Sequence, residues 1–202
     1  MRSEFRIASI LIPIVLIVGT AAALDPDEQL LVKARAHLAS AIYHRMRGDL
    51  ANARIQIEKA LYSYDRSTFL HMMLAKIAFR MQDMKVAEFE CKYALELDPK
   101  CAQAYTLLGR MSLMKGRLTD AIGYFRKAIE ADPKYVEPRF YLASLASSVG
   151  DIVTAEEQYK ELIKLNPLYA PFHFNLGRLY MAQEKYDEAI EEMEAAIKIS
   201  EG

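Results

Sequence analysis

Three of the four histidines are spaced in a way that could build a row of metal ligands. His37, His71 and His173 differ by multiples of 34 residues, and His44 follows seven residues after His37. Imidazole is a common ligand of zinc, copper and nickel. Residues seven apart on a helix, however, are separated by about 10 Å, which is too far for one shared metal ion. The row is also interrupted by other residue types, so we expect no metal and no cofactor.

Other chemistry-bearing motifs are missing from the sequence. It contains no glycine-rich phosphate loop, no nucleophile-elbow motif and no His-Glu-x-x-His zinc motif. Cys91 and Cys101 have no neighbouring histidine, and a disulfide between them would need a sharp reversal of the chain. We expect one buried thiol and one thiol in a connection. The sequence therefore predicts a protein that is not an enzyme.

A period of 34 residues runs along most of the chain without an insertion. Small residues and prolines recur at this step: Ala75, Gly109, Ala143 and Gly177; Ala53, Ala87, Ala121, Ala155 and Ala189; Pro99, Pro133 and Pro167. A fixed period of this length is typical of stacked supersecondary units that bury a shared core. Such arrays present surfaces for binding more often than they carry out reactions.

Each unit reads as helix, tight turn, helix and short joint. In the unit 102–135, Gly116 separates two apolar runs of helical spacing, and Asp132-Pro133 ends the second run. Gly48 and Gly150 repeat the stop, whereas Gln82 and Glu184 replace it at a small expected cost. Small residues at 109 and 121 should let two helices approach closely.

These units resemble the tetratricopeptide repeat. The best match runs from Ala-Tyr-Thr-Leu-Leu-Gly to Ala-Ile-Glu-Ala-Asp-Pro, residues 104–133, and five units share its register: 34–67, 68–101, 102–135, 136–169 and 170–202. The resemblance implies an all-α fold, a right-handed α-α superhelix of helix-turn-helix repeats, whose concave side contacts ligands. The pattern departs from the family at Ser40 and Leu162, and at the joint prolines of the first and last units.

The N-terminal segment 1–24 differs from the repeats. Arg2 and Arg6 precede an uncharged run over 7–24 that ends in Ala21-Ala22-Ala23. This pattern indicates either a cleaved signal peptide or an uncleaved membrane anchor, and both would place the repeat domain, 25–202, outside the cytoplasm, in a bacterial periplasm. Asp25 and Pro26 should begin the first helix, which we expect to be longer than its counterparts.

Composition limits the partners. The chain has 26 basic and 27 acidic residues, which argues against a nucleic-acid partner held by bulk charge. At the other end of the chain, Ile190, Met193 and Ile197 follow a helical stripe that we expect to be partly uncovered. That stripe could join another copy or another protein.

One line of first-helix positions carries an excess of basic and apolar side chains. It holds five basic residues against one acidic residue, in a chain that is otherwise balanced. Such a surface suits a peptide that combines carboxylates with apolar side chains; the alternative is that its apolar members pack between helices. We call the basic, aromatic and methionine residues of this line, together with Arg80 just beside it, the predicted groove: Arg35, Arg45, Phe69, Met72, Lys76, Phe79, Arg80, Arg110, Phe140, Phe174, Arg178 and Met181.

The sequence thus favours a protein-protein interaction scaffold that captures a partner segment in its groove, with envelope assembly (pilus, secretion or outer-membrane machinery) as the expected setting. Two alternatives stay open: a self-assembling subunit that stacks through its last helix, and a non-catalytic regulatory partner of an enzyme. The resemblance does not extend to a carboxylate clamp, because Arg110 and Arg178 occupy positions where the family would have Asn.

Overall fold

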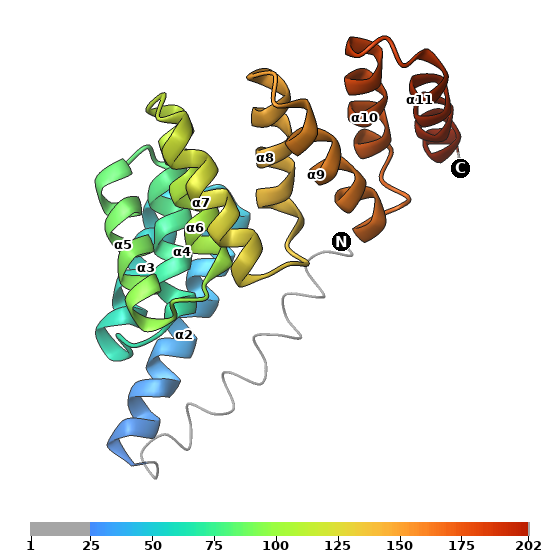
Figure 1. The fold of residues 1–202 in the computed structure, drawn as a ribbon. Helices are drawn as coiled ribbons and strands as arrows, with labels where there is room; N and C mark the ends of the chain where they lie inside the picture. Colours follow the sequence, from blue (N-terminus) through green and yellow to red (C-terminus); the bar gives the residue numbers. More distant parts are fainter. Residues whose placement is uncertain (1–24, 202) are drawn as a thin grey trace. The chain divides into compact units, whose positions relative to one another are not determined.

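The computed structural model describes residues 25–201, in which α-helices are joined by short turns (Figure 1). Segment 1–24, with its predicted signal or anchor, lies outside the described residues. No helix within 25–201 has the length and apolar character needed to cross a membrane. The helices are α2 (Pro26–Met46), α3 (Leu50–Ser63), α4 (Thr68–Arg80), α5 (Met84–Leu97), α6 (Ala102–Met114), α7 (Leu118–Ala131), α8 (Val136–Ser148), α9 (Ile152–Leu165), α10 (Ala170–Ala182) and α11 (Tyr186–Glu201).

The first described helix begins as the sequence predicts. The side chain of Asp25 accepts a hydrogen bond from the backbone N–H of Glu28 at 2.8 Å, and the carboxylate of Glu28 accepts one from the N–H of Asp25. Together with Pro26 in the first turn, this capping box satisfies backbone donors that a helix start leaves unpaired. Helix α2 has 21 residues, against 13 in α4, α6, α8 and α10, which confirms its expected extra length.

The turn inside each helix pair needs a left-handed residue. Gly48, Gly116 and Gly150 adopt φ values of 78°, 69° and 79°, which cost glycine little because it has no Cβ. Gln82 and Glu184 take the same place with φ values of 62° and 59°. The predicted stop positions are therefore confirmed, and two of them hold a side chain in a conformation that L-residues disfavour.

Aspartate begins the second helix in three of the five pairs. Asp49, Asp83 and Asp151 each accept a hydrogen bond from the backbone N–H three residues later. Arg117 occupies the equivalent place before α7 and makes no side-chain cap. The guanidinium of Arg54 on α3 also bonds the carboxylate of Asp83 at 2.9 Å, so this cap joins α3 to the start of α5.

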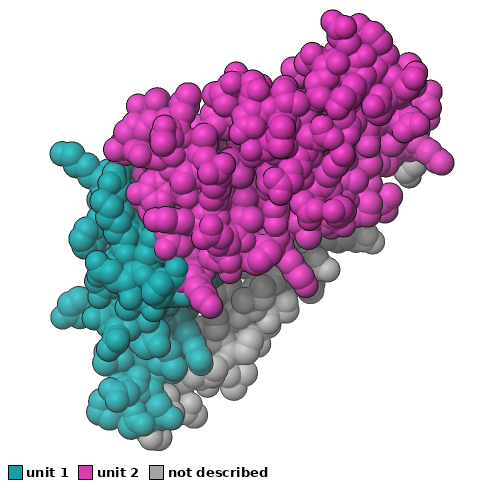
Figure 2. All heavy atoms as spheres, in the orientation of Figure 1, with its two compact units in different colours: residues 1–99 teal, residues 100–202 magenta. Residues whose placement is uncertain are grey.

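The chain divides into two compact units, residues 1–99 and 100–202 (Figure 2). In the first unit, the core lies among α2, α3 and α4 and is built from small and aliphatic residues; its members are Ala34, Ala41, Ala53, Ile57, Ala60, Leu70, Leu74 and Ile77. Their burial away from water supplies the main free-energy gain that holds these helices together.

The second unit packs three helix pairs, α6/α7, α8/α9 and α10/α11, with larger core residues. The ring of Phe125 is fully buried, stacks 5.3 Å from the ring of Tyr141, and fills a notch at Gly109. A Cβ at position 109 would lie only 2.6 Å from that ring. The small residue predicted to allow close helix approach is thus required by one specific aromatic side chain.

Candidate functional site

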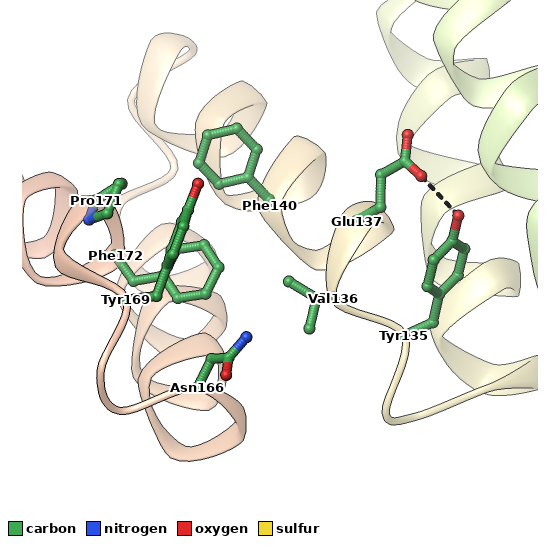
Figure 3. Close-up of a pocket in the computed structure, with 8 residues that line it drawn as sticks. All are labelled: Tyr135, Val136, Glu137, Phe140, Asn166, Tyr169, Pro171 and Phe172. Atoms are coloured by element: carbon green, nitrogen blue, oxygen red, sulfur yellow. Dashed lines mark hydrogen bonds between the residues drawn. The ribbon is translucent and has the colours of Figure 1, made fainter. Parts of the chain in front are cut away.

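A hollow of about 370 Å³ lies between the N-terminal turns of α8 and α10 in the second unit. Figure 3 shows the residues that line it: Tyr135, Val136, Glu137, Phe140, Asn166, Tyr169, Pro171 and Phe172. Of these, only Phe140 belongs to the predicted groove, although Glu137 and Pro171 lie on the same line of first-helix positions. The structure therefore gathers part of that line around an apolar hollow that is open to solvent.

The apolar wall of the hollow is aromatic. The rings of Tyr169 and Phe172 meet edge to face at 4.5 Å, and the rings of Phe140 and Phe172 lie 6.1 Å apart. These rings stand together on one side of the view in Figure 3, opposite Tyr135 and Glu137. Edge-to-face contacts of this kind hold aromatic side chains in defined positions, so the wall is preformed for an apolar side chain.

The polar edge of the hollow is a small hydrogen-bonded network. The hydroxyl of Tyr135 donates to the carboxylate of Glu137 at 2.6 Å, and the guanidinium of Arg110 donates to the other carboxylate oxygen at 3.3 Å. Burial, together with this carboxylate, raises the pKa of Tyr135 well above its usual range. Arg110 also lies over the ring of Tyr141, 5.6 Å from its centroid. The guanidinium of Arg110, predicted to meet acidic groups of a partner, thus already meets an acidic group of its own chain.

Predicted groove residues on the first unit divide by exposure. Arg35, Arg45, Phe69, Lys76 and Arg80 are exposed, and Phe79 is half-buried. The prediction that Met72 adds exposed apolar surface is wrong, because its side chain is only 3% exposed. Helix α4 buries residues on most of its circumference, so a stripe chosen for one face includes a position that belongs to the core.

On the second unit, the exposed members of the predicted groove cluster on α10. Phe174, Arg178 and Met181 are all exposed, and the guanidinium carbon of Arg178 lies 6.0 Å from the centroid of the Phe174 ring. Phe140, by contrast, is half-buried and packs against the core of α8, α9 and α10. The alternative reading, that apolar groove residues pack between helices, therefore holds for Phe140.

The sequence did not single out the two tyrosines that frame the hollow. Tyr135 and Tyr169 are one period of 34 apart, and each occupies the residue before a first helix, where neither makes a side-chain cap. Tyrosine is not a preferred capping residue. A repeated tyrosine at this place was the available signal, and the structure shows that both side chains line the hollow.

The row of histidines has a structural role that spacing alone did not show. Nδ1 of His71 lies 2.6 Å from a carboxylate oxygen of Glu90, and Nε2 lies 2.7 Å from the backbone carbonyl of Asp65. His173 repeats both contacts, with Glu192 at 2.7 Å and the carbonyl of Pro167 at 3.0 Å. In both repeats, one imidazole ring thus connects the second helix of its own repeat to the joint before it.

Arginine takes over the same place in the fourth repeat. Arg139 donates to Gln158 at 2.9 Å and to the carbonyl of Pro133 at 3.1 Å. We call this arrangement the joint clasp: a first-helix donor bonds a second-helix side chain 19 residues later and a joint carbonyl six residues earlier. The recurring 19-residue pairs in the sequence were the signal that could have revealed it.

The two cysteines differ in burial: Cys91 is buried and Cys101 is half-buried. Within residues 25–201, no group of three or more His, Cys, Asp or Glu side chains could hold a metal ion.

Comparison with known proteins places the fold. No curated protein matches the sequence. A crystal structure of MamA has 24% identity and a TM-score of 0.69, and the match covers 80% of this chain and 94% of that one. MamA from Desulfovibrio magneticus RS-1 has 15% identity and a TM-score of 0.69, covering 84% and 96%. YrrB, described as a TPR protein with an unusual peptide-binding site, has 20% identity and a TM-score of 0.61, covering 81% and 84%.

The family is set by the sequence match. Residues 72–136 and 142–202 match the tetratricopeptide repeat, and a second form of the same repeat matches residues 124–157. These segments make up more than half of the chain, and the helix pairs found in the structure are those of this repeat. The chain therefore belongs to the tetratricopeptide repeat family, a family of protein-interaction scaffolds.

Proposed function

We propose that the protein captures a segment of a partner protein on its first-helix surface and works by binding, not by catalysis. The observation that carries this proposal is the aromatic hollow between α8 and α10, which is open to solvent and walled by Phe140, Tyr169 and Phe172. A preformed apolar space with a few polar groups at its edge is the usual form of a recognition site.

The exposed side chains next to the hollow suggest the chemistry of the partner. An aromatic or aliphatic side chain fits the hollow, while Arg178 presents a guanidinium to solvent two turns along α10 from Pro171. Arg178 lies against the ring of Phe174, which limits its rotamers and leaves its donors available for a carboxylate. A partner segment with an apolar anchor followed by an acidic residue matches both features.

The test is a selection of displayed random peptides on the whole chain. We expect the selected peptides to carry Asp or Glu close to Phe, Leu or Tyr. Their affinity, measured by fluorescence anisotropy, should weaken about tenfold or more in Arg178→Glu, because the acidic residue would then meet a like charge. Lys164→Glu on α9, also at an exposed position, is the matched charge control and should change the affinity little.

The first unit has its own matched pair. Phe69 on α4 and Phe89 on α5 are 59% and 63% exposed, so they differ in helix and not in exposure. If a selected peptide also uses the first-helix surface of this unit, Phe69→Ala weakens it and Phe89→Ala does not. The proposed groove is contradicted if the two variants of each pair weaken peptide affinity equally. It is also contradicted if the selected peptides lack acidic residues.

We place this activity outside the cytoplasm, in assembly of the cell envelope. Support comes from the sequence alone: Arg2 and Arg6 ahead of an uncharged run that ends in a small-residue cleavage pattern. Fusion of alkaline phosphatase after residue 202 should give an enzyme that is active in a bacterial host, and deletion of residues 2–24 should abolish that activity. An inactive fusion with the intact N-terminal segment would refute the placement.

A further inference from the structure

Two apolar repeat positions are covered by the next helix in the fourth repeat and are exposed in the fifth. Phe140 and Ile163 are partly buried against the core that α10 completes. Their equivalents 34 residues later, Phe174 and Ile197, are 49% and 58% exposed. They line a hollow of about 630 Å³ together with Ala170, Pro171, Met193, Ala196, Ser200 and Glu201.

The covered copy shows what fits the open one. Helix α10 covers the fourth repeat with Phe172, Leu176 and Leu179, which follow an i, i+4, i+7 spacing and are nearly fully buried in one cluster with Tyr159 and Leu162. The hollow on α10 and α11 offers equivalent positions, so its natural occupant is a helix with large apolar residues at the same spacing.

Helix α11 adds a charge requirement. Tyr186, Ile190, Met193 and Ile197 are spaced by four, three and four residues, which is the heptad pattern of a helix-pairing face. The exposed acidic residues Asp187, Glu194 and Glu201 recur every seven residues along one edge of this stripe. An occupant helix therefore needs Lys or Arg beside its apolar stripe.

We propose that the face formed by α10 and α11, which we call the exit face, docks an amphipathic helix of a partner protein with large apolar residues at i, i+4 and i+7 and basic residues along one edge. This site shares Pro171 and Phe174 with the first-helix line, but its remaining wall and its acidic edge belong to α11, so it takes a partner of opposite charge.

A second copy of the chain fits this face poorly. In the first repeat, the residues equivalent to Phe172, Leu176 and Leu179 are Ala36, Ser40 and Tyr43, which are too small or polar to fill the hollow. Pairing of α11 with its own copy would bring another row of carboxylates to the same seam. An anionic membrane surface would meet the same repulsion.

The experiment uses two synthetic helical peptides and the whole chain. Both carry Phe, Leu and Leu at i, i+4 and i+7; one has Lys along one edge of the stripe, and the other has Glu at the same positions. We expect the Lys peptide to bind about tenfold or more tightly than the Glu peptide by fluorescence anisotropy. Ile197→Ser should weaken the Lys peptide about tenfold, whereas Val153→Ser on exposed α9 should not change it.

Reversing the charge of the acidic edge tests whether that edge selects the peptide. Glu194→Lys with Glu201→Lys should make the protein prefer the Glu peptide, while Glu157→Lys on α9 should leave the original preference intact. Phe69→Ala should not affect either peptide, which separates this face from the proposed groove. The proposal is overturned if neither peptide binds or if the two bind equally. Dimers in sedimentation that Ile197→Ser dissociates would overturn it in favour of a second copy of the chain. Binding to phosphatidylcholine–phosphatidylglycerol vesicles that Ile197→Ser abolishes would overturn it in favour of a membrane.

Discussion

Helix α10 presents two phenylalanines, two residues apart, to different surroundings. Phe172 is 3% exposed and packs against the ring of Tyr169 and the core of α8 and α9, whereas Phe174 is 49% exposed beside Arg178. Residue type is the same, so the difference comes from what covers each side of the helix. In this repeat, the packed side stabilises the fold, and the open side is available to a partner.

The sharpest test of this contrast is truncation of each ring. Phe172→Ala should lower the free energy of unfolding by about 3–5 kcal/mol, because it removes a buried ring and leaves a cavity. Phe174→Ala should lower it by less than about 1 kcal/mol, because half of its ring is already in water. Urea denaturation followed by circular dichroism measures both values, and similar losses would show that α10 has no open side.

Two glycines extend the contrast to small residues. Gly109→Ala should destabilise the protein by roughly 1–3 kcal/mol, since the added methyl group meets the buried ring of Phe125. Gly123 lies on the exposed side of α7, with no atom near an added Cβ. Gly123→Ala should therefore stabilise the protein by about 0.5–1 kcal/mol through helix propensity. Thermal melts should show shifts of opposite sign.

The joint clasp is the polar part of the packed side. His71→Ala should cost about 1–3 kcal/mol, because Glu90 is only 8% exposed and would lose its donor. His37→Ala, at the equivalent place, removes a bond to Gln56 that is less buried, and should cost about 1 kcal/mol. Equal effects in urea denaturation would mean that burial of the acceptor does not matter here.

The turns offer a smaller gain. Gln82→Gly should raise the free energy of unfolding by about 0.5–1 kcal/mol, because glycine adopts the required positive φ without a Cβ clash. Replacing Gly116 with Gln is the reverse experiment at the equivalent turn and should lower it. A loss of stability in Gln82→Gly would show that the side chain makes a contribution greater than the backbone strain.

The smallest effect concerns pH at a half-buried cap. The hydrogen bond from Arg54, and then the backbone hydrogen bond from Val86, lower the pKa of Asp83. A carboxyl whose pKa is lower in the folded state contributes stability above its unfolded value of about 3.9, and this contribution is lost as the pH falls through the folded value. Asp83→Asn keeps a capping residue without the charge, so its urea midpoint should drop less than that of the wild type between pH 6 and pH 3.

Sequence reasoning predicted the features that depend on local chemistry. The start of α2 at Asp25-Pro26 and the left-handed turn at Gly48 follow from capping and backbone preferences, which need no knowledge of the neighbours. The turn at Gln82 follows from its place in the 34-residue period. The apolar stripe of α11 was likewise expected to be partly uncovered, and Ile197 is 58% exposed.

Features that depend on neighbouring helices were not predicted. Periodicity assigned Met72 to an exposed face, but it does not state how much of a helix circumference is covered, and α4 is covered on most sides. The pairing of Arg110 with Glu137 joins side chains 27 residues apart. The hollow is lined by Tyr135 and Tyr169, which come from two different connections between repeats. Such contacts depend on how consecutive pairs pack, which the period alone does not specify.

The joint clasp bears on how such a chain could have grown. Two of its three members, the donor and the side-chain acceptor, are encoded within a single 34-residue segment, and the third is a backbone carbonyl that any preceding residue supplies. A gene duplication that copies one segment therefore delivers a complete set of bonding partners wherever it is inserted. The stabilising contribution of the clasp therefore does not depend on which side chains the preceding repeat carries.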